Sequence, residues 1–258
     1  MIIFAIVLLL LIIIGYLVFS KNKSKPEILE TLGDNYKKLL NEQVSYYQKL
    51  TAQDKNKFEE LIKSFLKSVH IEGVGTEVTD SDRVLVASSA VIPIFGFPGW
   101  QYTNLTNVIL YPDTFNNDFQ FEGESRNIMG MVGSGYMNGQ MLLSRDALVS
   151  GFSKSSGKDN TAIHEFVHLL DKSDGATDGV PEILMAHEYS IPWLKMIHQE
   201  MHRIEAGKSD INPYALTDEA EFLAVVSEYF FQKPEQLQQK HPELYKQLSQ
   251  LYMQNIVS

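Results

Sequence analysis

The sequence predicts an α+β domain that is preceded by one apolar helix at the N-terminus. Two observations carry the prediction for the domain. Short segments rich in β-branched and aromatic residues lie in the middle of the chain, and longer segments with helical spacing of apolar residues follow them. Strands grouped ahead of helices are typical of an α+β fold, in which a small central sheet packs against several helices.

The chain begins with an uncharged apolar segment, Ile2 to Phe19, followed directly by the basic sequence KNKSK. As a helix this segment would be about 27 Å long, close to the hydrocarbon thickness of a bilayer. The alternative is a cleavable signal peptide, which would need a basic start and a small-residue cleavage site that the segment lacks. We therefore expect a transmembrane anchor over residues 1–20, a polar tether over 21–40 and a folded domain over 41–258. The lysines after the anchor predict that the domain lies in the cytoplasm.

Composition limits the partners and ligands of the domain. The net charge of −10 argues against a nucleic-acid partner, because contacts to phosphates require a basic surface. The chain has no cysteine, so it forms no disulfide, and any metal ion must be bound by nitrogen and oxygen ligands.

Local signals predict the elements of the domain in order. Thr51 and Asp54 resemble a capping box, and the apolar residues that follow, up to Val69, repeat at helical spacing. The glycines of IEGVG are expected to end this helix. The other predicted elements are a helix from Asp80 to near Pro93, strands at Asn107–Pro112 and Gln140–Ser144, a loop or hairpin at 130–139, and helices at 159–172, 183–206, 217–232 (with Thr217 as its cap) and 241–254.

The sequence TAIHEFVHLLDKSDG, residues 161–175, carries the main functional signal. His164 and His168 are four residues apart, so on a helix both rings lie on one face and can bind one metal ion. Glu165 is turned by about 100° around the helix, where it can act as a base rather than as a ligand. A catalytic zinc ion keeps three protein ligands and one water. The pattern therefore predicts a zinc site that activates water for attack on a carbonyl, with Glu165 as general base.

The competing interpretation is an amphipathic helix whose histidines make only structural hydrogen bonds. A second pair in HQEMH, His198 and His202, has the same spacing, but Gln199 replaces the base and charged residues surround the pair, which indicates a solvated helix face. The segment DKSDGATDGV lacks the spacing and the closing glutamate of an EF-hand, so we expect a turn there rather than a calcium site. The lone histidines, interpreted as structural, are His70, His187 and His241.

A third protein ligand is needed, and three carboxylates compete for this role. Asp171 shares the face of the two histidines, but a third helical turn lies too far along the axis, so it fits better as a partner of a ring N–H or of the following loop. Glu221 and Glu228 lie seven residues apart on one face of an otherwise apolar helix. A buried carboxylate requires a partner or a metal ion. Spacing alone does not decide between these two glutamates.

Several segments together resemble the MtfA-like zinc metallopeptidases of bacteria, whose zinc site is similar to that of the anthrax lethal factor protease domain. The resemblance runs from VSYYQKL to LYMQN and rests on FEELIKSFLKSVHIEGVG, VILYPDTF, GQMLLSRDAL, HEFVHLLDKSDGATDGVP and YALTDEAEFLAVVSEYFF. It implies a zincin-like fold, one Zn²⁺ per chain, and Glu221 as the third ligand with Glu228 in a supporting role. It also implies that Tyr214 lies near the metal, where its phenol can donate to a developing oxyanion. In a bacterium, the anchor would make this a single-pass protein of the cell inner membrane.

Two features depart from that family. The anchor is not part of its common core, and the glycine- and methionine-rich segment 127–141 is longer than the family's usual turn. In zincin-like folds the strand beside the active-site helix commonly holds substrate by main-chain pairing, so Gln140–Ser144 is the candidate strand. The segment before it either gates access to the site or is a mobile surface hairpin.

These observations favour a membrane-anchored zinc peptidase that acts on a peptide or protein substrate. A regulatory binding protein of the same fold, which sequesters a partner such as a transcriptional repressor, is the alternative. The presence of Glu165 separates the two hypotheses, because a protein that only binds has no need of the base. Hydrolysis of an amide that is not a peptide would use the same residues.

Overall fold

The computed structural model describes residues 33–123, 126–133, 135–153, 155–182, 184 and 190–257. The predicted anchor at 1–20 and the tether up to residue 32 lie outside the described residues, and so does His187. Within the described ranges, no helix is both long enough and apolar enough to cross a membrane.

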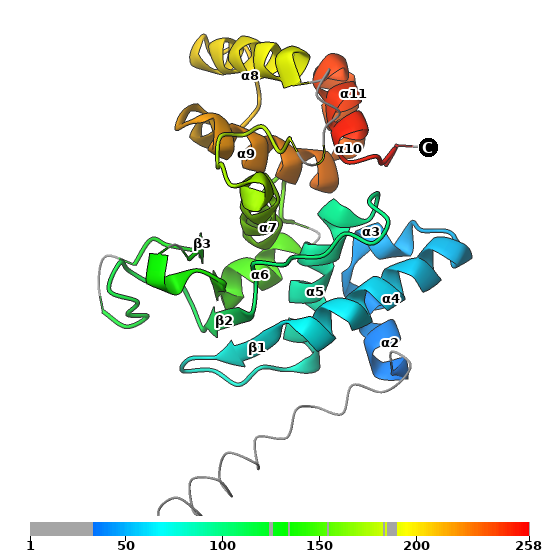
Figure 1. Cartoon of the computed structure of the whole chain (residues 1–258), viewed down its shortest axis with the longest axis vertical. Coiled ribbons are helices and arrows are strands. Elements are labelled where there is room, and N and C mark those ends of the chain that lie inside the picture. Colours follow the sequence, from blue (N-terminus) through cyan, green and yellow to red (C-terminus); the bar gives the residue numbers. More distant parts are fainter. Residues whose placement is uncertain are drawn as a thin grey trace, which may run out of the picture.

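The structure combines one small sheet with many helices, in agreement with the predicted α+β class, but helices also precede the first strand (Figure 1). The helices are α2 (Asp34–Gln43), α3 (Ser45–Gln48), α4 (Ala52–Ser68), α5 (Asp80–Ile94), α6 (Arg145–Gly151), α7 (Thr161–Asp171), α8 (Ser190–Glu205), α9 (Glu219–Gln232), α10 (Pro234–Lys240) and α11 (Pro242–Leu251). Short 3-10 helices are η1 (Gly135–Met137), η2 (Lys172–Asp174) and η4 (Pro213–Leu216). The strands are β1 (His70–Gly73), β2 (Asn107–Tyr111), β3 (Gly130–Val132) and β4 (Gln140–Ser144).

The four strands form one sheet in the order β1-β2-β4-β3. β1, β2 and β4 run parallel, and β3 pairs antiparallel with β4. β4 therefore has a neighbour on each side, and its main-chain groups are already paired within the sheet. The expectation that Gln140–Ser144 holds a substrate by main-chain pairing is wrong, because only a strand at the edge of a sheet has unpaired groups to offer. In the described sheet, the edge next to β4 is β3.

The packed part of the chain starts earlier than residue 41. α2 begins at Asp34, inside the segment predicted as tether, and Leu40 is fully buried in the core. The side chains of Asn35 and Tyr36 also donate to the carboxylate of Asp80, at 2.7 and 3.1 Å, which fastens α2 to the start of α5. Within residues 34–40, Lys37 and Lys38 lie on the exposed face of this helix rather than in a linker.

Capping side chains explain where several helices begin. Thr51 accepts from the backbone N–H of Asp54 at the start of α4, as predicted. α9 begins one residue later than expected, because Asp218 rather than Thr217 is its cap and accepts from the N–H of Glu221 at 2.8 Å. An aspartate here also favours the helix dipole. The cap therefore sets the turn of α9 on which Glu221 lies.

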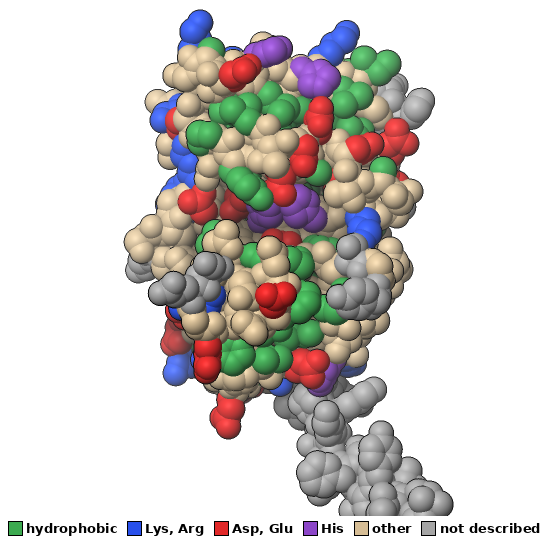
Figure 2. All heavy atoms as spheres, turned by 90° about the vertical axis from the view of Figure 1, so that its left-hand side faces the viewer, with side chains coloured by type: hydrophobic (Ala, Val, Ile, Leu, Met, Phe, Trp, Pro, Cys, Tyr) green, Lys and Arg blue, Asp and Glu red, His purple; other side chains and the backbone are tan. Residues whose placement is uncertain are grey.

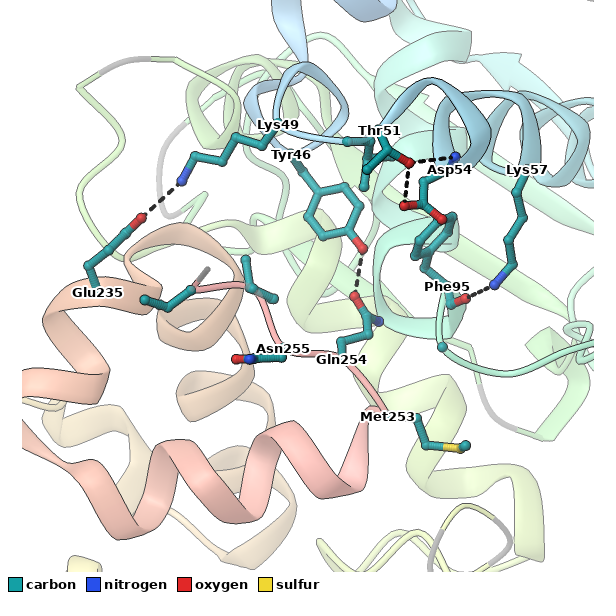
Figure 3. Close-up of a pocket in the computed structure, with 14 residues that line it drawn as sticks. Tyr46, Lys49, Thr51, Asp54, Lys57, Phe95, Glu235, Met253, Gln254 and Asn255 are labelled. Atoms are coloured by element: carbon teal, nitrogen blue, oxygen red, sulfur yellow. Dashed lines mark hydrogen bonds and ion pairs between the residues drawn. The ribbon is translucent and has the colours of Figure 1, made fainter.

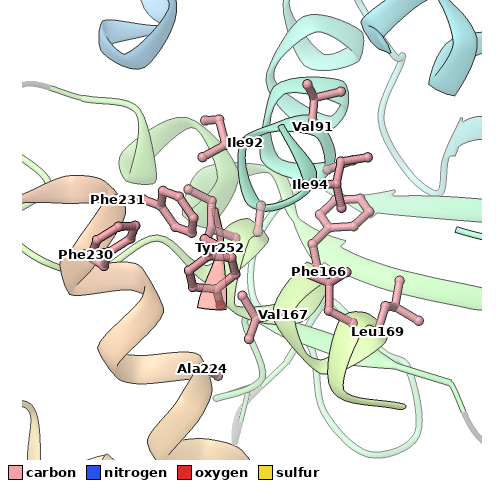
Figure 4. Packing of buried hydrophobic residues seen from close by; sticks show 14 of the residues in the cluster. Val91, Ile92, Ile94, Phe166, Val167, Leu169, Ala224, Phe230, Phe231 and Tyr252 are labelled. Carbon is pink, nitrogen blue, oxygen red and sulfur yellow. The ribbon is translucent and has the colours of Figure 1, made fainter. Parts of the chain in front are cut away.

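α7 lies at the centre of the molecule. It runs between a group formed by α8 to α11 and the part that contains the sheet, α4 and α5 (Figure 1). Figure 4 shows side chains of α5, α7 and α9 pointing toward one another around Tyr252. Phe166 is fully buried, with its ring centre 5.7 Å from that of Phe65 and 5.2 Å from that of Tyr102. Burying such a ring contributes about 1.5–3 kcal/mol, so the apolar side of α7 fixes the direction of its polar side.

Candidate metal centre

The polar side of α7 carries the two histidines of the HEFVH sequence. Asn160 caps the helix, since its Oδ1 accepts from the N–H of Ile163 at 3.1 Å. His164 and His168 follow one turn apart, and their ring centres are 4.8 Å from each other. Both side chains are mostly buried but reach solvent at one end. The helix therefore presents two imidazoles side by side at the surface of a depression.

Glu221 of α9 meets these rings from the opposite side. Its Oε2 lies 2.9 Å from Nε2 of His164 and 3.5 Å from Nε2 of His168. The two Nε2 atoms are 3.1 Å apart. The three residues form a group whose ligand atoms all lie within 4.8 Å of one another and that could hold a metal ion. Tertiary packing of α9 against α7 thus brings together residues that are more than fifty positions apart in the sequence.

Glu228 contacts His164 on the side of the ring that faces away from His168 and Glu221. Its Oε1 is 2.7 Å from Nδ1 of His164, and its Oε2 accepts from the backbone N–H of Asn160. A carboxylate on Nδ1 holds the proton at that nitrogen and leaves Nε2 free to bind a metal. Of the two glutamates that spacing could not separate, Glu221 faces the space between the rings and Glu228 faces the back of one ring.

The histidines and glutamates of the cluster shift one another's pKa values. Burial alone would lower the pKa of His164, but hydrogen bonds with Glu221 and Glu228 outweigh it and raise the pKa to about 10. Burial would raise the pKa of Glu221, whereas its hydrogen bonds with His164 and His168 hold that pKa well below the usual range. The carboxylates thus favour a positive charge between the rings. A bound cation would supply that charge without a proton.

Glu165 lies beside the cluster and does not belong to it. Its side chain is buried, and burial raises the pKa of its carboxyl, while the charges of His164 and His168 oppose this shift. Nearby Glu221 raises the pKa further. A carboxyl with a raised pKa is better matched to proton transfer near neutral pH than an ordinary glutamate.

Tyr214 lies near His164 and is partly exposed. It belongs to η4, where Asn212 accepts from its backbone N–H at 3.0 Å, and its ring centre is 6.1 Å from that of His164. The side chain is about half exposed. Burial and the charge of Glu221 raise the pKa of the phenol, so its hydroxyl keeps its proton at neutral pH and can donate a hydrogen bond.

Asp171 serves the loop after α7. Its Oδ2 accepts from the N–H of Gly179 at 2.9 Å, and burial raises the pKa of this carboxyl to about 6. Among the described residues, Oδ1 of Asp171 and Nδ1 of His168 are both buried without a hydrogen-bond partner. Of the two roles considered for Asp171, the structure contains the contact with the loop and not a hydrogen bond with a ring.

The remaining histidines differ from the pair in α7. His198 and His202 are largely exposed on α8, 3.5 Å from Glu219 and 3.6 Å from Glu205, which agrees with a solvated helix face. His241 is buried, and its two ring nitrogens lie 3.2 Å from Glu200 and 2.8 Å from Asp210. Sequence reasoning missed these partners because they come from segments more than thirty residues away.

A hollow crosses one face of the molecule (Figure 2). Figure 2 shows histidine side chains in a depression across the middle of one face, with acidic side chains beside them and apolar patches above and below. A separate pocket of about 690 Å³ lies between the start of α4, the end of α5 and the C-terminal segment (Figure 3). Tyr46, Lys57 and Gln254 are among the residues that line it, and no residue of the histidine cluster does. The candidate metal centre is therefore separate from that pocket.

Comparison with known proteins relates this chain to a family of metallopeptidases. The model of a family described as glucose-regulated metallo-peptidase M90 matches residues 20–253. An uncharacterized protein of Synechocystis, slr2042, is 28% identical over 249 residues, which are 92% of this chain and 90% of that protein. Mlc titration factor A of Serratia proteamaculans is 28% identical over 195 residues, covering 70% of this chain and 72% of that protein. The protein of the same name from Salmonella agona is 28% identical over 223 residues, with 80% and 81% covered.

Proposed function

The chain belongs to the glucose-regulated metallo-peptidase M90 family, and from this premise we propose that it is a zinc-dependent peptidase. In this proposal His164, His168 and Glu221 bind one Zn²⁺, and Glu165 is the general base. The observation that carries it is the convergence of two imidazoles and one carboxylate, with their ligand atoms within 4.8 Å of one another, beside a buried glutamate that is not a ligand.

The dimensions of the cluster support zinc. Ligand atoms held by a tetrahedral zinc ion at about 2.0–2.1 Å lie ~3.3 Å apart. The three separations in the cluster are 2.9, 3.1 and 3.5 Å. Two imidazole nitrogens and one glutamate oxygen are also a donor set that zinc accepts in catalytic sites. When bound, the ion supplies a Lewis acid that lowers the pKa of a water and polarises a carbonyl.

Three residues of the chain have the remaining roles in the proposed reaction. Glu165 accepts the proton of the attacking water at its carboxylate and can return it to the leaving amine. Tyr214 donates a hydrogen bond from its phenol to the oxyanion that forms at the carbonyl. Glu228 keeps the ring of His164 oriented by accepting from Nδ1. Partial burial of the cluster limits water around it, which strengthens each of these interactions.

We propose that the peptide substrate pairs with β3. This strand is the edge of the sheet next to β4, and Gly130 at its start lies against Glu165 of α7. An extended peptide can add to an exposed edge by main-chain hydrogen bonds, which do not depend on its side chains. β3 therefore replaces β4 as the candidate for substrate binding.

Zinc content together with peptide turnover tests the proposed function. The full-length chain should contain about one zinc per molecule and hydrolyse peptides. Glu165→Gln should retain zinc and lose hydrolysis, because the amide cannot accept the proton. His164→Ala should lose zinc, while His202→Ala, on the exposed face of α8, should not. Equal turnover by Glu165→Gln and the unmodified chain would refute the proposal.

We also propose, from the sequence, that residues 1–20 anchor the protein in the cell inner membrane and that the peptidase domain lies in the cytoplasm. Removal of residues 1–20 should move the protein from the membrane fraction to the soluble fraction. A protease added outside intact spheroplasts should leave the domain uncut. Cleavage of the domain under these conditions would reverse the proposed orientation.

The second candidate is a regulatory binding function. Two of the relatives described above are named Mlc titration factor A, and this name says that those proteins titrate Mlc. We infer for this chain a regulatory protein partner that binds at the same hollow. Glu165→Gln discriminates the functions, since a binding protein would keep its partner and its biological effect without the base. Loss of the biological effect while zinc and partner binding are retained would favour the peptidase alone.

A further inference from the structure

Gly130 is the first residue of β3. The space that a side chain at this position would occupy is filled by the side chain of Glu165. A Cβ atom at position 130 would lie 2.7 Å from both Cγ and Oε1 of Glu165 and 2.9 Å from Cγ2 of Thr161. These separations are well inside van der Waals contact. Thr161 precedes Glu165 by one helical turn, so both atoms belong to the same face of α7. The main chain at position 130 thus packs directly on this face.

Backbone conformation does not by itself require a glycine here. Gly130 is not among the residues with positive φ, and it pairs in regular register with Leu143 of β4. An L-residue could adopt the same extended conformation. The requirement comes from the neighbour, Glu165, whose buried side chain occupies that space.

The alternation of side chains along β3 explains the direction of the contact. Met131 packs with the small cluster of Tyr111, Phe115 and Leu142 on one face of the sheet. Val132 packs with the main core on the other face. Gly130 shares the face of Val132, because side chains two residues apart point the same way. A side chain at position 130 would therefore point toward α7, into the space that the Glu165 carboxylate fills.

We propose that Gly130 is a positioning residue for Glu165: its bare main chain forms the wall that sets where the carboxylate lies. The catalytic part of this inference rests on the proposed function, in which Glu165 is the base. A methyl group at position 130 would displace the carboxylate by about 1 Å, and a displacement of that size lowers a rate by roughly 100-fold. The three metal ligands are not among the nearest neighbours of the added atom, so zinc binding should be unchanged.

A stability cycle tests the contact without relying on activity. Gly130→Ala should lower the midpoint of thermal unfolding of the full-length chain. In the Glu165→Ala background the same change should lower the midpoint much less, because the contacts with Cγ and Oε1 of Glu165 are gone and only the contact with Cγ2 of Thr161 remains. Met131→Ala, on the other face of β3, is the matched control and should have the same effect in both backgrounds. Destabilisation by Gly130→Ala of similar size in both backgrounds would refute the contact.

Kinetics then test the positioning role. Gly130→Ala should retain the zinc content of the unmodified chain, keep KM and lower kcat by roughly 100-fold. A proportional loss of folded, zinc-bearing protein, or an unchanged kcat, would refute positioning. If the unmodified chain binds no zinc or hydrolyses nothing, the proposed function fails, but a much smaller destabilisation by Gly130→Ala in the Glu165→Ala background would still establish the Gly130–Glu165 contact. The two failures are therefore distinguishable.

Discussion

Oε1 of Glu228 lies 2.7 Å from Nδ1 of His164, so a carboxylate on α9 orients a ring on α7. The other oxygen of Glu228 accepts from the N–H of Asn160, the residue that caps α7. One side chain therefore ties the direction of the ring to the start of its helix. Seven residues earlier on α9, Glu221 faces Nε2 of the same ring, and this division of roles leads to the first prediction.

Glu228→Gln should weaken zinc binding by about 10–100-fold without abolishing it, as expected when a carboxylate behind a ligating histidine is lost. Glu221→Gln should weaken binding much more, because it replaces a proposed ligand. Competition with a chromophoric chelator measures both affinities. Glu219→Gln, an exposed carboxylate on the same helix, is the control and should leave the affinity unchanged. A larger loss for Glu228→Gln than for Glu221→Gln would exchange the two roles.

Tyr214→Phe should lower kcat by about 100-fold with little change in KM, because loss of one oxyanion donor acts mainly in the transition state. Steady-state kinetics on one peptide substrate provide the measurement. Tyr36→Phe is the control. It removes a phenol that donates to Asp80 at the start of α5, and it should leave kcat unchanged. An equal kcat for Tyr214→Phe and the unmodified chain would mean that the phenol takes no part in the reaction.

The buried His241 should make stability depend on pH. Hydrogen bonds with Glu200 and Asp210 raise the pKa of His241 above its ordinary value, although burial opposes them. Burial would raise the pKa of Asp210, but hydrogen bonds with Lys158, Lys240 and His241 hold it far below its usual range. Burial would also raise the pKa of Glu200, and His241 and Arg203 lower it instead. The contribution of protonated His241 is therefore complete below about pH 6.5 and is lost as pH rises through its raised folded-state pKa.

The corresponding measurement compares the unmodified chain with His241→Gln by urea unfolding between pH 6 and pH 9. The difference in unfolding free energy should shrink as pH rises, because the histidine releases the proton that the folded state holds. At acidic pH the unfolding free energy of the unmodified chain should also fall, because Asp210 and Glu200 become protonated. His202→Gln, largely exposed on α8, should show no such trend. A difference for His241→Gln that is constant across this range would contradict the raised pKa.

Gly179→Ala should destabilise the protein more than Gly175→Ala. Both glycines have positive φ, at 76° and 102°, so alanine is strained at each by about 1–2 kcal/mol. A Cβ at Gly179 would also lie 2.2 Å from the carbonyl oxygen of Glu219, whereas at Gly175 nothing lies within 4 Å. The difference in unfolding free energy between the variants measures that close approach. Equal destabilisation would mean that the loop and α9 separate easily.

Part of the site was accessible from the sequence because its geometry is local. The four-residue spacing of His164 and His168 places both rings on one face of any α-helix, and Glu165 follows from the same periodicity. The strands at Asn107–Tyr111 and Gln140–Ser144 were likewise visible from their composition. β1 and β3 were not, because each is short and contains glycine, and pairing with β2 or β4 makes them strands.

Sequence alone determined that one helix offers two imidazoles and an adjacent base, since those relations depend only on the helical repeat. Tertiary structure alone decided that Glu221 meets the rings while Glu228 stands behind one of them, since two residues seven apart leave a helix in nearly the same direction. It also decided that β3 forms the edge of the sheet and that His241 has acidic partners. Such choices depend on how distant segments pack, and packing is set by the burial of the whole core rather than by any local repeat.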